Sequence, residues 1–296
     1  MIALTGFSDA GGAVAQLEEY FWGNSGLETL VTFDTDQLYD YRARRPTIVF
    51  NGEHLGDYDA PELALFLAKD DLEHPFLLLM GVEPDFRWEG FVSAMQSLVA
   101  DYQVASMTWV HSIPMPVPHT RPTAVTVSGT RTDLIEARSV WKPTTQISAT
   151  AGHLLELRLM DRGLDVTGFA LLIPHYLAEN EYPTALLAAL ESIMSSTGLI
   201  LPTDEVRERG REMLARIDEQ IAGNPDSVTM VSTLEQRHDA YMRDLTLRSP
   251  LVSDDGTLPT ADQLGGEFER FLQDQRGEDT PPFGGFPDAE QPNSGE

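Results

Sequence analysis

The sequence contains no cysteine and little positive charge, and each absence excludes classes of function. Its 296 residues include 20 lysine and arginine residues against 47 aspartate and glutamate residues, a formal net charge of -27. Without cysteine the chain forms no disulfide, has no thiolate nucleophile and cannot bind zinc or iron–sulfur clusters through sulfur. Because extended polyanions and anionic membranes bind positive charge, we expect neither a nucleic acid nor a membrane as a partner.

Long apolar segments and lysine-bearing phosphate loops are also missing. No run of about 18 apolar residues occurs and no export signal is visible, so we expect a cytoplasmic protein. The apolar segment Ile2–Phe7 indicates an abrupt domain start or a few missing upstream residues. Lysine occurs only at Lys69 and Lys142, which disfavours a P-loop or ATP-grasp enzyme. The histidines lack metal-ligand spacing, so we expect no metal and no cofactor.

Apolar segments that alternate with helical patterns predict an α/β domain over residues 1–200, with a mostly parallel mixed sheet flanked by helices. The expected strands are Ile2–Phe7, Thr29–Phe33, Thr47–Phe50, Phe76–Met80, Val104–Val110 and Val166–Ile173. The expected helices are Ala13–Trp22, Trp88–Tyr102, Gly152–Asp161 and Pro183–Ser196.

One segment departs from this alternation. Residues 123–135 have period two on either side of Ser128 and Gly129, which indicates a β-hairpin inserted at about residues 122–143. Such a hairpin would project from a parallel sheet and leave an apolar surface that another subunit can cover. We expect this hairpin to assemble a homo-oligomer, and specifically a homotrimer. The alternative is that the hairpin is an active-site flap.

The C-terminal third divides into two parts. Between Thr203 and Leu247 the pattern is helical, with a break at Gly223 and Pro225, and we interpret residues 201–248 as a helical lid. Residues 249–296 contain 11 acidic and 2 basic residues, which predicts a largely disordered acidic tail; a docking peptide is the alternative.

Ligands of open α/β sheets bind outside the carboxyl ends of the strands, so polar residues that follow apolar runs are candidates. Asp9 and Gly11 lie in a small-residue segment before a helix, where backbone N–H groups can bind an anion, or where the glycines only allow packing. Glu83 follows a buried strand and either faces the crevice or caps the next helix.

Two later segments add histidine and arginine. His119 and Arg121, two residues apart in a proline-rich loop, suit a carboxylate or phosphate group, or Arg121 fixes the loop to an acidic neighbour. His175 and Tyr176 follow a strand, where a histidine with a nearby carboxylate is a general base or merely fixes the loop. No nucleophile partner is recognisable, so we assign no catalytic residue and leave open whether any reaction is catalysed. The candidate ligand-binding residues are Asp9, Gly11, Glu83, His119, Arg121, His175 and Tyr176.

Four segments together resemble the actinobacterial branch of the proteasome assembly chaperone 2 family, in order and in spacing, over about residues 1–247. They are Gly6–Gly11, Gly81–Trp88, Pro118–Pro122 and Pro174–Pro183. The resemblance implies an α/β core like that of purine nucleoside phosphorylases and peptidyl-tRNA hydrolases, with a helical portion over the crevice. Eukaryotic and archaeal relatives help assemble proteasome α-rings.

Two hypotheses of different classes follow. The first is a non-enzymatic oligomeric chaperone or scaffold with a protein partner, which the resemblance makes a proteasome-related one. The alternative is a binding protein or enzyme that acts on a small anionic or nucleoside-like ligand in a crevice under the helical lid.

Overall fold

The structure, a computed structural model, describes residues 1–6, 8–142 and 144–247. Residues 1–240 form one compact unit, and residues 241–296 are a second unit. The predicted acidic tail lies outside the described residues. The division at residue 200 between core and lid stays a prediction.

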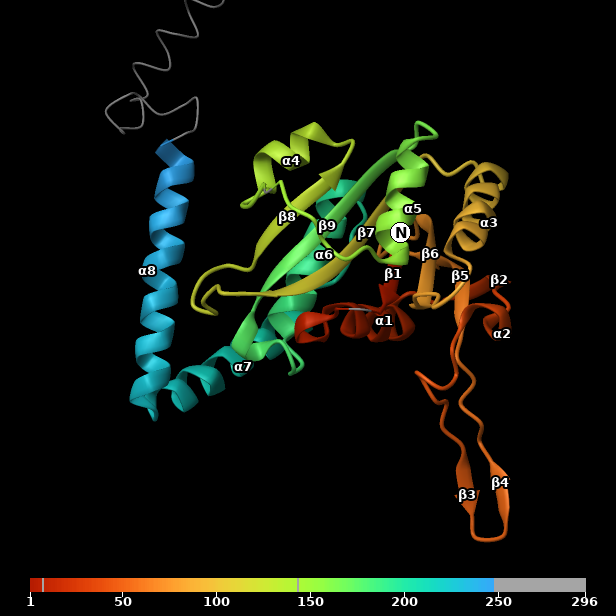
Figure 1. The fold of residues 1–296 in the computed structure, drawn as a ribbon, viewed down its shortest axis with the longest axis horizontal. Helices are drawn as coiled ribbons and strands as arrows, with labels where there is room; N and C mark the ends of the chain where they lie inside the picture. Colours follow the sequence, from red (N-terminus) through yellow and green to blue (C-terminus); the bar gives the residue numbers. More distant parts are fainter. Residues whose placement is uncertain (7, 143, 248–296) are drawn as a thin grey trace, which may run out of the picture. The chain divides into compact units, whose positions relative to one another are not determined.

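A seven-stranded mixed sheet forms the centre of the first unit, in the order β2-β5-β6-β1-β7-β9-β8 (Figure 1). The parallel strands β6, β1, β7 and β9 lie in the middle, whereas β2 and β5 on one side and β8 on the other are antiparallel to their neighbours. The α/β class and the mixed sheet are thereby confirmed. The strands are β1 Ile2–Thr5, β2 Glu28–Thr32, β5 Leu63–Lys69, β6 Pro75–Val82, β7 Ser106–Met115, β8 Ala124–Gly129 and β9 Asp165–Pro174.

Helices cover both faces of this sheet because alternate side chains along each strand point to opposite sides. On β7, for example, Val110 joins the core under α1 and α6, whereas Trp109 joins the core under α3 and α5. These helices are α1 Ala13–Asn24, α3 Trp88–Asp101, α5 Ala151–Met160 and α6 Pro183–Thr197. The short helices are α2 Thr35–Leu38 and α4 Thr132–Arg138, with 3₁₀ turns at Ala10–Gly12 and His175–Leu177.

The predicted hairpin at residues 122–143 is wrong in its geometry. Its first arm is β8, which pairs with β9 and belongs to the main sheet, and its second arm is helix α4. The chain turns at Gly129, whose φ of +107° suits glycine, and Leu134 is then buried against the sheet. A hairpin that projects from the sheet therefore does not exist at this position, while the homotrimer stays a prediction.

A β-hairpin insertion is present elsewhere in the chain. Strands β3 Val49–Asn51 and β4 His54–Gly56 pair only with each other and extend away from the main sheet (Figure 1). The predicted strand Thr47–Phe50 is thus one arm of a hairpin. Its turn contains Gly52, whose φ is +64°, in the left-handed region that glycine favours.

The helical pattern between Thr203 and Leu247 is confirmed by α7 Asp204–Ala222 and α8 Pro225–Leu247. Helix α7 packs on α6, where Gly210 lies close to Thr184. Within the described ranges no helix is long and apolar enough to cross a membrane.

Candidate functional site

Asp9 and Gly11 fix the start of helix α1. The Asp9 carboxylate accepts hydrogen bonds from the backbone N–H groups of Val14 and Ala15, at 2.8 and 3.0 Å, and from the Ser112 hydroxyl at 3.1 Å. Gly11 has a φ of +70°, and a Cβ there would lie 3.1 Å from Cβ of Tyr182. Asp9 therefore holds the first turn of α1 through hydrogen bonds, and Gly11 allows the chain to pack closely against Tyr182.

Glu83 caps helix α5, whereas the capping interpretation made from the sequence names the next helix along the chain, α3. Its side chain is buried and its Oε2 accepts a hydrogen bond from the backbone N–H of Ala151 at 2.9 Å. A carboxylate at this end of a helix is favoured by the helix dipole. Gly6 leaves the room, since a Cβ there would lie 2.6 Å from the Glu83 carboxyl group.

His119 and Tyr176 come together, and they contact helix α7 through Asp218. The Tyr176 hydroxyl accepts a hydrogen bond from the backbone N–H of His119 at 2.8 Å and lies 2.6 Å from its Nδ1. The Nε2 of His119 lies 3.0 Å from Oδ1 of Asp218. Burial raises the pKa of Tyr176 to about 12. His175 is exposed, and its ring meets that of Tyr176 edge to face.

Arg121 binds two carboxylates of helix α8. Its Nε and Nη2 donate to Asp239 at 2.9 and 2.7 Å, and its Nη1 donates to Glu235 at 3.3 Å. The hydrogen bonds from Arg121 hold the pKa of the Asp239 carboxyl well below its usual range. This is the geometry of the second alternative, in which Arg121 holds its loop to an acidic neighbour. That these residues bind a ligand stays a prediction.

We expect His119→Ala to lower the free energy of unfolding by about 1 kcal/mol, because it removes hydrogen bonds that join the loop to Tyr176 and Asp218. Urea denaturation followed by circular dichroism measures this. His175→Ala is the matched control, and since its side chain is exposed we expect no measurable change. Equal effects of the two variants would contradict the assignment.

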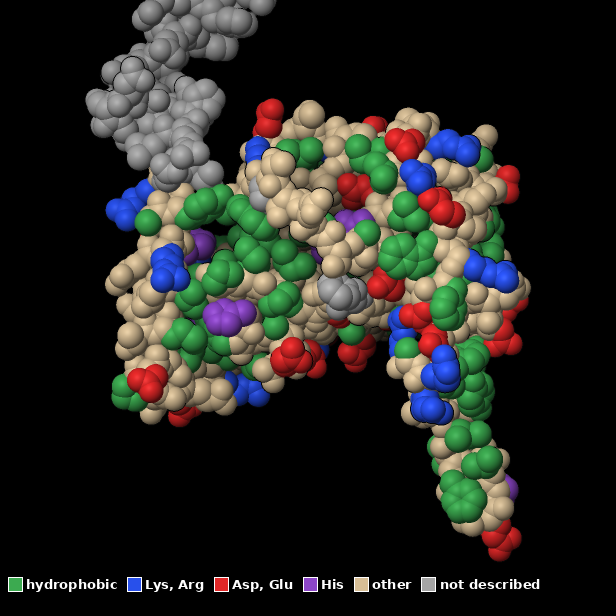
Figure 2. Space-filling model, in the orientation of Figure 1, with side chains coloured by type: hydrophobic (Ala, Val, Ile, Leu, Met, Phe, Trp, Pro, Cys, Tyr) green, Lys and Arg blue, Asp and Glu red, His purple; other side chains and the backbone are tan. Residues whose placement is uncertain are grey.

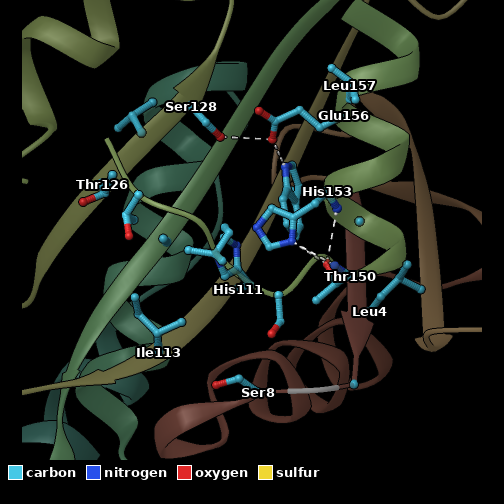
Figure 3. A pocket seen from close by; sticks show the side chains of 18 of the residues that line it. Leu4, Ser8, His111, Ile113, Thr126, Ser128, Thr150, His153, Glu156 and Leu157 are labelled. Atoms are coloured by element: carbon cyan, nitrogen blue, oxygen red, sulfur yellow. Dashed lines mark hydrogen bonds between the residues drawn. The ribbon is translucent and has the colours of Figure 1, made fainter. Parts of the chain in front are cut away.

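The seven predicted residues do not share one cavity. A cavity of about 970 Å³ lies on the face of the sheet that α5 covers, and Glu83 is the member of the predicted set that lines it. None of its lining residues belongs to α7 or α8, so it is not a crevice under the helical lid. Its walls come from β1, β7, β8, β9, α5 and the segment between α4 and α5, as Figure 3 shows in part.

Three aromatic rings form one wall of this cavity. The rings of Trp109 and His111 stack with centroids 4.5 Å apart, and His153 of α5 meets both edge to face at 5.0 Å. The Nδ1 of His111 is buried without a hydrogen-bond partner among the described residues. His153 Nδ1 accepts a hydrogen bond from the backbone N–H of Thr150 at 3.2 Å and also lies 2.8 Å from the Thr150 hydroxyl (Figure 3).

Glu156 lies beside these rings in a hydrogen-bonded cluster. Its Oε2 accepts hydrogen bonds from the indole N–H of Trp109 and from the Ser128 hydroxyl, the latter at 3.0 Å (Figure 3). Gly168 of β9 lies beneath them, and a Cβ there would be 2.5 Å from Ser128 Oγ and 2.6 Å from Trp109 Nε1. Glycine at this position therefore leaves space for the cluster.

Burial disfavours the charged forms of His111, His153 and Glu156. It lowers the pKa of His111 to about 3, with a smaller contribution from His153, and it lowers the pKa of His153 as well. Burial also raises the pKa of Glu156, against the hydrogen bonds from Trp109 and Ser128. Both imidazoles are thus neutral near pH 7.

The cluster provides hydrogen-bonding groups and no recognisable catalytic unit. Ser128 donates to a carboxylate and not to a histidine, so it lacks the base that activates a serine nucleophile. The described residues contain no group of histidine, aspartate and glutamate side chains able to hold a metal ion.

The sequence analysis missed His111, His153 and Glu156. The signal was available in part, because His111 interrupts the apolar side of β7 and Glu156 is buried in an otherwise apolar stripe of α5. A buried charged residue needs partners, and this need marks such positions as worth inspection.

Comparison with known proteins adds to this geometry. The PAC2 family model matches residues 3–221. The chain belongs to the PAC2 family. The resemblance of its four segments to that family is thereby confirmed. No curated protein matches the chain.

Solved structures of other proteins share the fold. A protein of unknown function from Mycobacterium tuberculosis is 36% identical, with a TM-score of 0.77 over 83% of this chain and 84% of that one. A protein of unknown function from Corynebacterium glutamicum is 34% identical, with a TM-score of 0.78 over 82% and 91%. A proteasome-assembly chaperone homologue from Mycobacterium tuberculosis is 19% identical, with a TM-score of 0.71 over 78% and 98%.

Proposed function

We propose that this PAC2 family protein is a non-enzymatic chaperone or scaffold that binds a proteasome-related protein through the β3–β4 hairpin. The exposed apolar surface of this hairpin carries the proposal. Membership of the family, and the fold shared with a proteasome-assembly chaperone homologue, support a proteasome-related partner.

The hairpin exposes large apolar side chains that nothing in the described part of the chain covers. Phe50 and Leu55 face each other across the two strands and are 66% and 63% exposed, and Val49 and Tyr58 are 44% and 54% exposed. Figure 2 shows these hydrophobic side chains along the hairpin. An isolated two-stranded hairpin is marginally stable in water, so a partner that covers its apolar side chains would stabilise it.

Charge at the base of the hairpin indicates what kind of surface the partner presents. Arg42, Arg44 and Arg45 precede the hairpin in a chain whose net charge is -27, and Figure 2 shows basic side chains there. Arg42 and Arg44 pair with Asp40 and Asp85, so Arg45 supplies the net positive charge of this segment. An apolar surface bordered by carboxylates would complement this combination. A second copy of this strongly acidic chain is the competing occupant, and the experiment below separates the two.

The test is binding of the purified protein to the purified proteasome core particle of the same organism. We expect Phe50→Ser/Leu55→Ser to weaken that binding by about tenfold or more, because apolar residues at the centre of an interface carry most of its affinity. Leu72→Ser is the matched control, since Leu72 is 59% exposed on a different turn and should leave the affinity unchanged.

Sedimentation of each variant without the partner distinguishes the two occupants. A change of oligomeric state in the hairpin variant, together with unchanged binding to the core particle, would assign the hairpin to contacts between copies and overturn the proposal. Absence of binding by the unaltered protein would overturn it as well.

A further inference from the structure

We propose that the cavity beside α5 binds a neutral, largely apolar small molecule that carries a hydroxyl or amide group. Its volume of about 970 Å³ lies at the upper end of the range of small-molecule sites, about 300 to 1,000 Å³. This inference is independent of the hairpin and of its protein partner.

The apolar character of the walls indicates the body of the ligand. The apolar lining residues are Leu4, Trp109, Ile113, Ile135, Trp141, Ile147, Leu157 and Met160, besides smaller ones. Several of them are exposed although they line a concave site: Ile147 is 66% exposed and Leu157 is 51% exposed. Covering this apolar surface with a ligand removes it from water, which favours binding.

The carboxyl groups in the wall of the cavity disfavour an anion as the ligand. Two carboxyl groups, Glu83 and Glu156, lie in its wall, and Lys142 is the basic residue among its described lining residues. A carboxylate or phosphate that entered would lose its hydration near these carboxyl groups. The small anion expected at Arg121 thus does not suit this cavity.

The two histidines indicate the polar group of the ligand. Because the Thr150 N–H donates to Nδ1 of His153, the neutral ring carries its proton on Nε2 and can donate there. His111 lines the same cavity, and its Nδ1 has no partner within the described residues. Figure 3 shows both residues at the cavity. A hydroxyl or amide group both donates and accepts, so it matches a pair of neutral imidazoles.

The cavity forms because of what the strands place on this face of the sheet. Small or polar side chains occupy alternate positions there, Thr126 and Ser128 on β8 and Gly168 and Ala170 on β9. The opposite face of the same strands carries large buried residues such as Phe169 and Leu171. The space therefore follows from the alternation of small and large side chains along two strands, and the segment that precedes α5 borders it.

The experiment measures fluorescence of the neutral dye Nile red with the full-length protein, and its displacement by dodecan-1-ol or by dodecanoate. We expect saturable binding of the dye, and displacement by the alcohol at a concentration at least about tenfold lower than by the carboxylate. Ala170→Phe, which places a ring in the cavity, should abolish dye binding. His111→Phe keeps a ring against Trp109 but removes the nitrogens, and should lower the affinity for dodecan-1-ol about fivefold.

Two control variants distinguish dye binding in the cavity from dye binding at other apolar surfaces. Phe50→Ser/Leu55→Ser and His54→Phe, both on the exposed hairpin, should leave dye binding unchanged. The first of them also makes failure of this inference distinguishable from failure of the proposed function. The inference is overturned if the dye does not saturate, if Ala170→Phe folds and still binds it, or if dodecanoate displaces it as well as the alcohol does. If Ala170→Phe does not fold, unchanged alcohol affinity of a folded His111→Phe variant overturns the inference.

Discussion

Replacing Gly168 with alanine is expected to lower the free energy of unfolding by about 3 kcal/mol. A Cβ at this position would meet Ser128 Oγ at 2.5 Å and Trp109 Nε1 at 2.6 Å, and would also clash with the Glu156 carboxylate. Ser128 and Trp109 both donate hydrogen bonds to the Glu156 carboxylate, so a shift of any of the three groups breaks a hydrogen bond. Urea unfolding followed by tryptophan fluorescence measures the change.

Gly210→Ala is the matched control for this substitution. Gly210 lies inside α7, and a Cβ there would be 3.5 Å from the Thr184 hydroxyl, an ordinary contact. Alanine is the better helix former, so the control should raise stability by about 0.5 to 1 kcal/mol. Opposite signs for the two variants would support the packing over Gly168, whereas a Gly168→Ala protein as stable as the unaltered one would refute it.

Lowering the pH from 7 to 5 is expected to cost about 2 kcal/mol through His111 alone. Burial lowers the pKa of this residue from 6.5 to about 3 in the folded protein. The unfolded chain therefore binds a proton below pH 6.5 that the folded chain does not bind. The contribution of His111 is complete above pH 6.5 and is lost progressively as the pH falls towards 3.

The measurement compares unfolding free energies of the unaltered protein and His111→Phe between pH 5 and 7. Other groups titrate here too; burial raises the pKa of Glu18 to about 7, which acts in the opposite direction. The difference between the two proteins removes such common contributions and should shrink as the pH falls. A constant difference for His111→Phe would show that the ring is readily protonated in the folded protein.

Sequence reasoning located most helices and strands but missed β5. Leu63–Lys69 is rich in leucine and alanine, which favour helices, and its strand conformation follows from pairing with β2 and β6. The β3–β4 hairpin was missed although Gly52 and Glu53 form a two-residue hairpin turn between short apolar segments. The period-two pattern at residues 123–135 misled because its second half is a short helix.

Most of the candidate residues have local structural roles, and whether they bind a common ligand stays a prediction. Asp9 and Glu83 cap helices, and Arg121 and His119 hold a loop to α8 and α7. Helix capping by Glu83, although of α3, and loop fixing by Arg121 are the interpretations that the sequence offered. The sequence could not predict that the candidate residues lie apart. The positions of His119 and Arg121 depend on how their loop packs against α7 and α8.

The sequence by itself determined the α/β class, the pairing of helix and strand patterns and the PAC2 family, since these depend on local periodicity and on short motifs in order. The tertiary structure alone decided where a cavity lies. His111, Ser128, His153 and Gly168 belong to four different elements, and none of these elements by itself shows that the four residues lie together. They become a site only because the register of β7, β9 and β8 places them on one face of the sheet under α5.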